Sequence, residues 1–122
     1  MKHDQDFIIL CEQALSAVKE ISILNVEDHL EKNTALVIDV REDHEWEKGH
    51  LPGAQHLGRG ILERDIATLI NDKSASIVLY CGGGYRSALS AHSLQLMGYS
   101  KIYSMRGGVR AWREANLPWE DD

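Results

Sequence analysis

The stretch IVLYCGGGYRSAL, Ile77–Leu89, decides the fold and the chemistry that this sequence predicts. A short apolar strand ends on Cys81, three glycines follow, and an arginine and a serine open a helix. Glycines reach positive φ without steric cost, so the loop is expected to curl and to direct successive N–H groups at one spot. The helix start adds unpaired N–H groups and the positive end of its dipole. This pattern predicts a reactive thiolate at Cys81, with Arg86 as a fixed positive charge.

The alternative interpretation is a buried structural cysteine followed by an ordinary glycine turn. Cysteine is among the residue types most often buried, so this alternative applies to any single cysteine. It does not explain why glycines, Arg86 and Ser87 follow Cys81 together. We therefore interpret Cys81 as a catalytic nucleophile and expect Tyr85 to project and shape the rim of its pocket. The anion-binding loop expected around the thiolate comprises Gly82, Gly83, Gly84, Tyr85, Arg86 and Ser87.

The number of residues between Cys81 and Arg86 helps to distinguish sulfur chemistry from phosphate chemistry. Four residues separate Cys81 from Arg86, whereas cysteine phosphatases place one residue more between the same two residue types. A shorter loop encloses a smaller space. The spacing therefore favours a loop that holds one extra sulfur atom on the cysteine over a loop that holds a tetrahedral phosphate.

The pattern Cys-x-x-Gly-x-Arg-Ser, formed by Cys81, Gly84, Arg86 and Ser87, resembles the active loop of the rhodanese (thiosulfate sulfurtransferase) family. Three other segments agree with the family's signatures and stand in the family's order. They are the Asp-Val-Arg-Glu and Gly-His-Leu-Pro-Gly-Ala motifs within 37–54, the segment 58–63, and the segment 106–112 followed by Leu117-Pro118. The resemblance runs from about Ile21 to the C-terminus.

This resemblance implies a single rhodanese-like α/β domain over residues 21–122, preceded by an N-terminal helical extension over residues 1–20 whose simplest role is to cover the core. It implies a sulfurtransferase that works without a cofactor through a persulfide on Cys81. The donor would be thiosulfate or a persulfide, and the acceptor a thiol, cyanide or a protein thiol. Because Arg86 is the only basic residue in the loop, the sequence points to weak thiosulfate turnover and to a persulfide as the natural donor. The oligomeric state is left open.

Composition agrees with one ordinary globular domain. The chain has 122 residues, of which 43% are hydrophobic and 26% charged, and these values are typical of soluble proteins. A net charge of −6 argues against a broad nucleic-acid surface. The two cysteines form no Cys-x-x-Cys pair, and no apolar run is long enough for a membrane span or shaped like a signal peptide. We therefore expect a cytoplasmic protein without membrane contact.

The hydrophobic pattern predicts alternating strands and helices. Apolar, β-branched runs predict strands at 35–40, 77–80 and 102–105, with a shorter strand at 54–57. Helical spacing predicts helices at about 4–20, 62–70, 89–97 and 109–115, and a short helix over 26–31 capped by Asn25. Gly98 is expected to end the 89–97 helix in a left-handed conformation. This order predicts an α/β fold with a mostly parallel sheet flanked by helices, and a ligand site at the carboxyl ends of the strands.

Other polar residues are expected to support the site. Asp39 and Arg41 follow a core strand, and we interpret them as a structural ion pair around the active loop rather than as catalytic groups. His50 lies in a Gly/Pro turn and is expected to be a hydrogen-bonding turn histidine rather than a base. Trp46 and Trp112 are expected to pack in the core.

Three further predictions concern charge, thiols and metals. Arg59 and Arg64 either attract an anionic sulfur donor to the mouth of the site or are two solvated side chains. Cys11 lies on an apolar helical stripe, which favours an inert buried thiol over a resolving cysteine. The histidines form no tight ligand pair and no cysteine stands at zinc spacing to them, so no metal site is expected.

Three alternatives to a sulfurtransferase enzyme come from other classes. A persulfide carrier or protein-binding module would deliver sulfur to one specific partner, with little thiosulfate turnover. A phosphatase or arsenate reductase would need the longer loop that is absent here. An inactive regulatory domain is difficult to reconcile with the intact Cys81.

Overall fold

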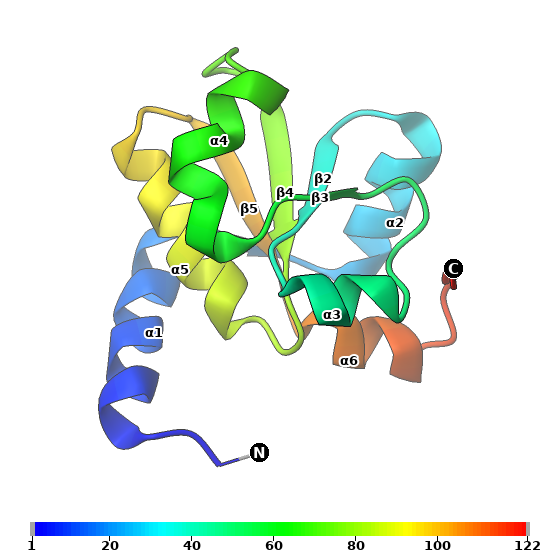
Figure 1. The fold of residues 1–122 in the computed structure, drawn as a ribbon, viewed down its shortest axis with the longest axis horizontal. Coiled ribbons are helices and arrows are strands. Elements are labelled where there is room, and N and C mark those ends of the chain that lie inside the picture. Colours follow the sequence, from blue (N-terminus) through cyan, green and yellow to red (C-terminus); the bar gives the residue numbers. More distant parts are fainter. Residues whose placement is uncertain (1, 122) are drawn as a thin grey trace.

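A five-stranded parallel sheet forms the centre of the computed structural model, which describes residues 2–121 (Figure 1). The strands are β1 (Lys19–Ile21), β2 (Leu36–Asp39), β3 (Gln55–His56), β4 (Ser76–Tyr80) and β5 (Lys101–Met105). Their order across the sheet is β1-β5-β4-β2-β3, and every neighbouring pair is parallel. The predicted α/β fold with a mostly parallel sheet is confirmed.

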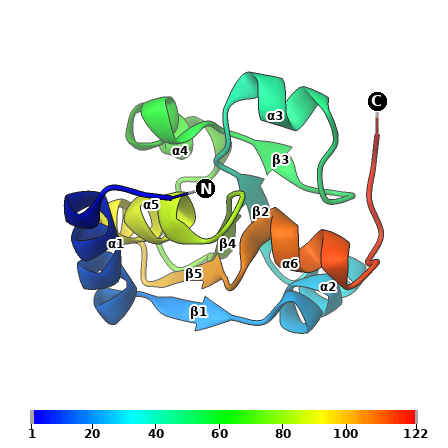
Figure 2. The ribbon, with the colours of Figure 1, turned by 90° about the horizontal axis from the view of Figure 1, so that it is seen from below.

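Helices cover both faces of this sheet. They are α1 (Gln5–Ala17), α2 (Ile23–Lys32), α3 (Asp43–Glu47), the 3-10 helix η1 (Arg59–Ile61), α4 (Leu62–Leu69), α5 (Tyr85–Leu96) and α6 (Gly108–Glu114). Figure 2 shows α1, α4 and α5 on one side of the sheet and α2 and α6 on the other. Side chains of β4 alternate between the two sides, as a strand's period of two requires. Ile77 and Leu79 belong to the hydrophobic core on the side of α1, α4 and α5, and Val78 and Tyr80 belong to the core on the side of α2 and α6.

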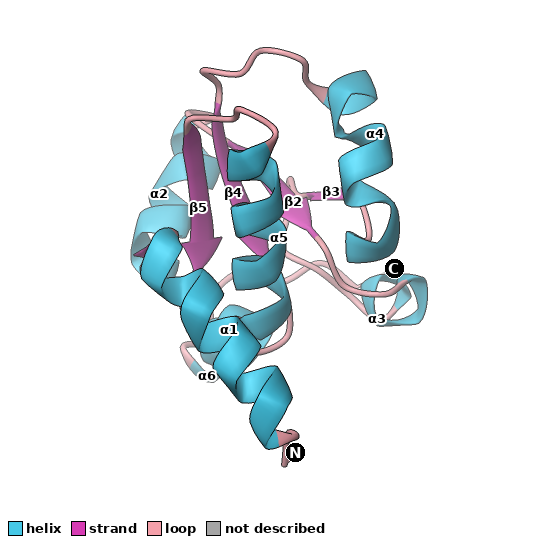
Figure 3. Ribbon diagram, turned by 90° about the vertical axis from the view of Figure 1, so that its left-hand side faces the viewer, coloured by secondary structure: helices cyan, strands magenta, loops and turns pink. Residues whose placement is uncertain are grey.

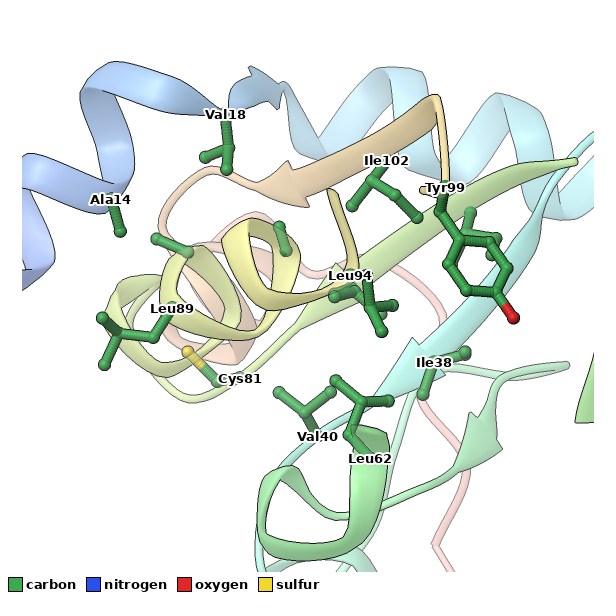
Figure 4. Close-up of a cluster of buried hydrophobic side chains, with 14 of the residues drawn as sticks. Ala14, Val18, Ile38, Val40, Leu62, Cys81, Leu89, Leu94, Tyr99 and Ile102 are labelled. Atoms are coloured by element: carbon green, nitrogen blue, oxygen red, sulfur yellow. The ribbon is translucent and has the colours of Figure 1, made fainter. Parts of the chain in front are cut away.

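The larger core lies between the sheet and the helices α1, α4 and α5, and Cys81 is at its edge (Figure 4). The helix α1 is anchored there by Cys11, Ala14 and Val18, which are all buried. Burying one aliphatic side chain the size of valine or leucine contributes about 1.5–3 kcal/mol, so this contact holds α1 firmly against α5. The buried position of Cys11 agrees with the interpretation of an apolar packing residue.

The N-terminal part of the chain differs from the sequence prediction. The first helix ends at Ala17 rather than near residue 20, because Lys19–Ile21 pair with β5 as an edge strand. The predicted cap at Asn25 is wrong. Ser22 caps α2, and its Oγ accepts a hydrogen bond from the Asn25 N–H at 3.1 Å. Both residue types suit this position, so the pattern alone did not separate them.

Two other elements show what the hydrophobic pattern omits. The short helix α3 has no buried residue, and a capping box between Glu42 and Glu45 starts it. Trp46 on this helix is only half-buried, so its predicted place in the core is wrong; its ring stacks on His50 at a centroid distance of 3.6 Å. Trp112 is buried as predicted, and Gly98 has the predicted left-handed conformation with φ of 100°. Within residues 2–121, no helix is long and apolar enough to span a membrane.

Candidate active site: the Cys81 loop

The sulfur of Cys81 is held by backbone N–H groups at the carboxyl end of β4. Its Sγ accepts hydrogen bonds from the Gly84 N–H at 3.1 Å and the Ser87 N–H at 3.3 Å. The Ser87 hydroxyl lies 3.5 Å from the sulfur and is itself fixed by the Ser104 hydroxyl at 2.8 Å. Cys81 is only 1% exposed, so these contacts act in a poorly hydrated setting where hydrogen bonds to an anion are strong.

The loop also contains N–H groups that have no acceptor. Within residues 2–121, the N–H groups of Gly82, Gly83, Tyr85 and Arg86 make no hydrogen bond. Together with the two N–H groups on the sulfur, they surround the entrance to α5, whose dipole places positive charge at the same end. The loop therefore has unused donors for a second anionic group beside Cys81.

The helix α6 determines which way the loop peptides point. The Val109 N–H donates to the Cys81 carbonyl at 2.9 Å. The next N–H, of Arg110, donates to the Gly82 carbonyl at 3.0 Å. These two bonds hold the carbonyl oxygens against the start of α6, which leaves the N–H sides of the loop free for the sulfur.

Gly108 permits this close approach between α6 and the loop. A Cβ atom at Gly108 would lie 2.6 Å from the Cys81 carbonyl oxygen and from the carbonyl of Gly82. Gly108 also has φ of 59°, in the left-handed region that favours glycine. Sequence analysis did not include Gly108 among the site residues, although it lies in the closing segment that carried the family resemblance.

The arginine of the loop is paired with a carboxylate from another element. The Arg86 guanidinium donates to both carboxylate oxygens of Glu45 on α3, at 2.8 and 3.1 Å. The hydrogen bond from Arg86 lowers the pKa of Glu45 to about 2. Arg86 thus ties the loop to α3, and Glu45 is a second residue of the site that sequence analysis missed.

Only one of the three loop glycines needs to be glycine for its backbone conformation. Gly84 has φ of 108°, whereas Gly82 and Gly83 lie outside the left-handed region. A Cβ at Gly83 would meet nothing within 4 Å, and one at Gly82 would lie 3.3 Å from the Arg86 side chain. The expectation that all three glycines curl through positive φ is therefore wrong, and a single left-handed residue turns the chain into α5.

Asp39 and Arg41 form a closed polar network beside the loop. Three hydrogen bonds from the Arg41 side chain reach the Asp39 carboxylate at 2.8–3.1 Å, and a fourth reaches the Gly49 carbonyl at 2.7 Å. Asp39 is fully buried, and the register pairs it with Tyr80 of β4. Burial and then the charge of Asp39 raise the pKa of Tyr80, whose hydroxyl accepts from the Leu51 N–H at 3.2 Å. The network fixes the end of β4 from which Cys81 extends.

His50 lies in the same network and away from the sulfur. Its ring is buried, stacks on Trp46, and places Nδ1 3.0 Å from the Leu51 carbonyl oxygen. Its backbone pairs with that of Glu120, which joins the C-terminal segment to this turn. The geometry places His50 among structural contacts, and Cys81 has no histidine hydrogen-bonded to its sulfur within residues 2–121.

The two arginines considered for substrate binding lie outside the hollow above Cys81. Arg64 is exposed and pairs with its neighbour Asp65 at 2.7 Å. Arg59 is exposed on η1, near enough to Cys11 that its charge opposes the effect of burial, which raises the pKa of the Cys11 thiol. Neither Arg59 nor Arg64 is among the residues that line the hollow, and their role in attracting a donor stays a prediction. Within the described residues, no group of three or more His, Cys, Asp or Glu side chains is arranged to hold a metal.

A hollow of about 420 Å³ opens above Cys81. The loop forms one wall through Gly83, Tyr85 and Arg86, and the N-terminal segment forms the opposite wall. Tyr85 projects from the loop toward this segment, where its ring lies 6.0 Å from that of Phe7. The site thus has a buried sulfur, a ring of backbone donors and an opening of the size of a small molecule.

Comparison with known proteins places these features in context. Residues 22–115 match the model of the rhodanese-like domain. The chain is 32% identical over 101 residues to the thiosulfate sulfurtransferase GlpE of Pseudoalteromonas translucida, covering 81% of this chain and 92% of that protein. It is 31% identical over 98 residues to the "Putative sulfur carrier protein YrkF" of Bacillus subtilis, covering 80% of this chain and about half (52%) of that longer protein.

Two solved structures resemble nearly the whole chain. The polysulfide-sulfur transferase homodimer of Wolinella succinogenes superposes with a TM-score of 0.83 at 28% identity, over 99% of this chain and 91% of that chain. A Rhodopseudomonas palustris protein of unknown function, called a "Possible Tyrosine Phosphatase", superposes with a TM-score of 0.87 at 27% identity, over 98% of both chains. Both alignments include the segment before residue 22, which the family model does not cover.

Proposed function

The chain belongs to the rhodanese-like family, and from this we propose that it is a sulfurtransferase whose Cys81 carries sulfur as a persulfide. One observation supports this most directly. The Cys81 sulfur accepts two backbone hydrogen bonds, and four N–H groups of the same loop have no acceptor within residues 2–121. A persulfide adds one anionic sulfur atom to the thiol, and the unused donors of the same loop are available to hydrogen-bond that atom.

The reaction proceeds in two transfers. The Cys81 thiolate attacks the outer sulfur of thiosulfate, the sulfur–sulfur bond of the donor breaks, and sulfite leaves with its electron pair. The terminal sulfur of the resulting persulfide is then attacked by an acceptor thiolate or by cyanide. The persulfide bond breaks, and Cys81 departs as a thiolate. Covalent catalysis of this kind replaces one difficult transfer by two easier ones and needs no cofactor.

The backbone of the loop binds the sulfur, and the Arg86 side chain holds the loop in place. The N–H groups of Gly82–Ser87 stabilise the anionic sulfur in the thiolate, the persulfide and the transition states between them. Arg86 braces the loop through Glu45, whose carboxylate offsets the positive charge of the guanidinium. Because this charge is largely neutralised by Glu45, the site is better suited to a singly charged persulfide donor than to doubly charged thiosulfate.

Intact-mass measurement tests the proposal. The protein is incubated with thiosulfate or with a small-molecule persulfide, desalted, and examined for the mass of one added sulfur atom. The unaltered protein and Cys11→Ala should gain the sulfur, whereas Cys81→Ser should not. Circular dichroism of the Cys81→Ser variant should show an intact fold. Sulfur addition that is lost in Cys11→Ala and retained in Cys81→Ser would overturn the proposal.

A second candidate is a persulfide carrier, favoured by the similarity to the protein named "Putative sulfur carrier protein YrkF". A carrier would load sulfur on Cys81 and deliver it to a partner protein's thiol, with slow turnover toward cyanide. Measuring both transfers from the same persulfidated sample separates the two candidates. Rapid transfer to cyanide or to a small thiol supports the enzyme, and transfer confined to a protein thiol supports the carrier.

The resemblance to a protein called a possible tyrosine phosphatase makes phosphate chemistry a useful control. The loop has four residues between Cys81 and Arg86, and Arg86 points its guanidinium at Glu45. Neither feature leaves an arginine free to hold a phosphate. The protein should therefore not hydrolyse an aryl phosphate. Hydrolysis as fast as sulfur transfer would favour a phosphatase over a sulfurtransferase.

A further inference from the structure

The N-terminal segment 2–7 lies across the mouth of the active site. It provides Lys2, His3 and Phe7 to the wall of the hollow that faces the loop, and Cys81 lies between the two walls. Figure 3 shows α1 along α5, with its first turn near the end at which α5 begins. This segment precedes residues 22–115, which match the rhodanese-like domain, so it is an addition to the family's common core.

A helix cap and core packing hold this segment in place. The Asp4 carboxylate caps α1 by accepting from the N–H groups of Asp6 and Phe7 at 3.0 and 3.4 Å. Further along, α1 is anchored in the core by Cys11 and its buried neighbours. A capped, core-anchored helix positions its first turn more rigidly than a free terminus would.

Aromatic rings join the wall to the catalytic loop. The ring centroid of His3 lies 5.2 Å from that of Phe7 and 5.5 Å from that of Tyr85. Phe7 and Tyr85 meet edge to face at 6.0 Å. These separations and tilts are those of favourable aromatic pairs, so the three rings make a continuous aromatic surface in the hollow that Cys81 also lines.

The rim of the hollow has unpaired positive charge. Within residues 2–121, Lys2 forms no ion pair, and neither does Arg110, which lines an adjoining hollow that shares His3 and Tyr85. Two carboxylates are also near: Asp4 is engaged as the helix cap, and Glu114 lines the adjoining hollow. Lys2 at this rim and Arg110 in the adjoining hollow are each free to pair with a carboxylate of a ligand.

Burial limits what reaches the sulfur. Cys81 is 1% exposed and lies within the hollow, so a cysteine on a flat protein surface would not reach it. A hollow of about 420 Å³ is within the range of small-molecule sites. This volume is large enough for a thiol the size of a short peptide.

Resting on the sulfurtransferase function above, we propose that residues 2–7 determine acceptor specificity by completing a pocket for small thiols that carry carboxylates. In the transfer, the acceptor thiolate attacks the terminal sulfur of the Cys81 persulfide, the persulfide bond breaks, and Cys81 leaves as a thiolate. The segment takes no part in bond making. It binds the organic part of the acceptor, which a molecule as small as cyanide lacks.

The test compares three acceptors on pre-formed persulfide: glutathione as an anionic thiol, cysteamine as a cationic thiol, and cyanide. Lys2→Glu should lower kcat/KM for glutathione about 5- to 10-fold through KM, raise that for cysteamine, and leave that for cyanide within twofold. Phe7→Ala should lower kcat/KM for glutathione about fivefold, again sparing cyanide. Lys19→Glu and Leu10→Ala, both exposed and away from the hollow, are the matched controls and should change none of the three.

Equal losses with glutathione and cyanide would show that the segment only supports the loop, and unchanged kinetics would show that it does not contact the acceptor; either result overturns the inference. If Phe7→Ala lowers Tm, the exposed Lys2→Glu variant decides alone. Failure of the unaltered protein to take up any sulfur would refute the proposed function itself. Sulfur uptake followed by transfer to protein thiols only would leave that function intact and refute the acceptor pocket.

Discussion

Two polar sites stand side by side at the carboxyl ends of β2 and β4, and they differ in how completely their hydrogen bonds are used. At the end of β2, the side chains of Asp39 and Arg41 bind each other and the Gly49 carbonyl. At the end of β4, the Cys81 loop keeps four N–H groups without an acceptor in the described part of the chain. The first arrangement is complete and specifies geometry, whereas the second leaves donors on half-buried and exposed residues unpaired.

The largest effect on stability is expected when a charge is removed from the Asp39–Arg41 site. Asp39→Asn should lower the free energy of unfolding by about 3–5 kcal/mol, because it leaves the buried Arg41 guanidinium without its counter-charge. Urea denaturation measures this effect. Asp28→Asn removes an exposed partner of Lys32 and should cost about 0.5 kcal/mol or less. If both variants lose equally little, the Asp39 network is not a structural support.

The next largest effect is expected at the contact between α6 and the loop. Gly108→Ala places a Cβ against the backbone of Cys81 and Gly82, so the loop must move or α6 must detach. We expect a loss of about 2–4 kcal/mol of stability and loss of persulfide formation, checked by thermal denaturation and intact mass. Gly60→Ala, which meets open space, is the control and should be nearly silent. Normal persulfide formation in Gly108→Ala would show that α6 does not set the loop.

A smaller, pH-dependent effect is expected at the ion pair that bridges the two regions. The pKa of Glu45 is about 2 when folded, below its usual value of 4.5, chiefly because of the hydrogen bond from Arg86. The ionised carboxylate therefore stabilises the fold fully above pH 4.5, and this contribution disappears as the pH falls toward 2. Glu45→Gln should cost roughly 1–2 kcal/mol at neutral pH, allowing for the partial exposure of the pair.

Urea denaturation of both proteins at several pH values checks this sign. The difference between the unaltered protein and Glu45→Gln should be constant from neutral pH down to about 4.5 and should shrink below it. Glu47→Gln, on the exposed side of α3, is the matched control. A difference that grows on acidification would contradict the assignment of the low pKa to Glu45.

The smallest effects sharpen the account of the loop itself. Gly84→Ala must hold a side chain at φ of 108°, which costs roughly 1–2 kcal/mol and should slow sulfur transfer. Gly83→Ala meets no atom within 4 Å and should change stability by about 0.5 kcal/mol or less. Thermal denaturation and the rate of persulfide formation separate the two variants. Equal effects would mean that the left-handed turn at Gly84 is not what shapes the loop.

Sequence patterns predicted most of the fold because the buried strands are strongly apolar. The runs that became β2, β4 and β5 lie between helices, and their order leads directly to a parallel sheet. The pattern was less informative where burial is slight. The edge strand Lys19–Ile21 has mixed polarity, and α3 has no buried residue, so neither has a periodic signal.

The candidate site shows a similar division between local and long-range information. The position of Cys81 before a glycine loop and a helix is local, and the sequence displays it directly. The partner of Arg86 is Glu45, 41 residues away, and the contact of Gly108 with the loop joins two separate elements. Such pairs depend on how strands are ordered in the sheet, which residue spacing along one chain does not contain.

The two hydrogen bonds from Val109 and Arg110 to the loop carbonyls also have a consequence for synthesis of the protein. The ribosome synthesises the chain from its N-terminus, so Cys81 leaves the exit tunnel before α6 does. Until Arg110 has left the exit tunnel, nothing holds the loop peptides with their N–H groups toward the sulfur. The loop conformation described above can therefore form only after α6 has been synthesised.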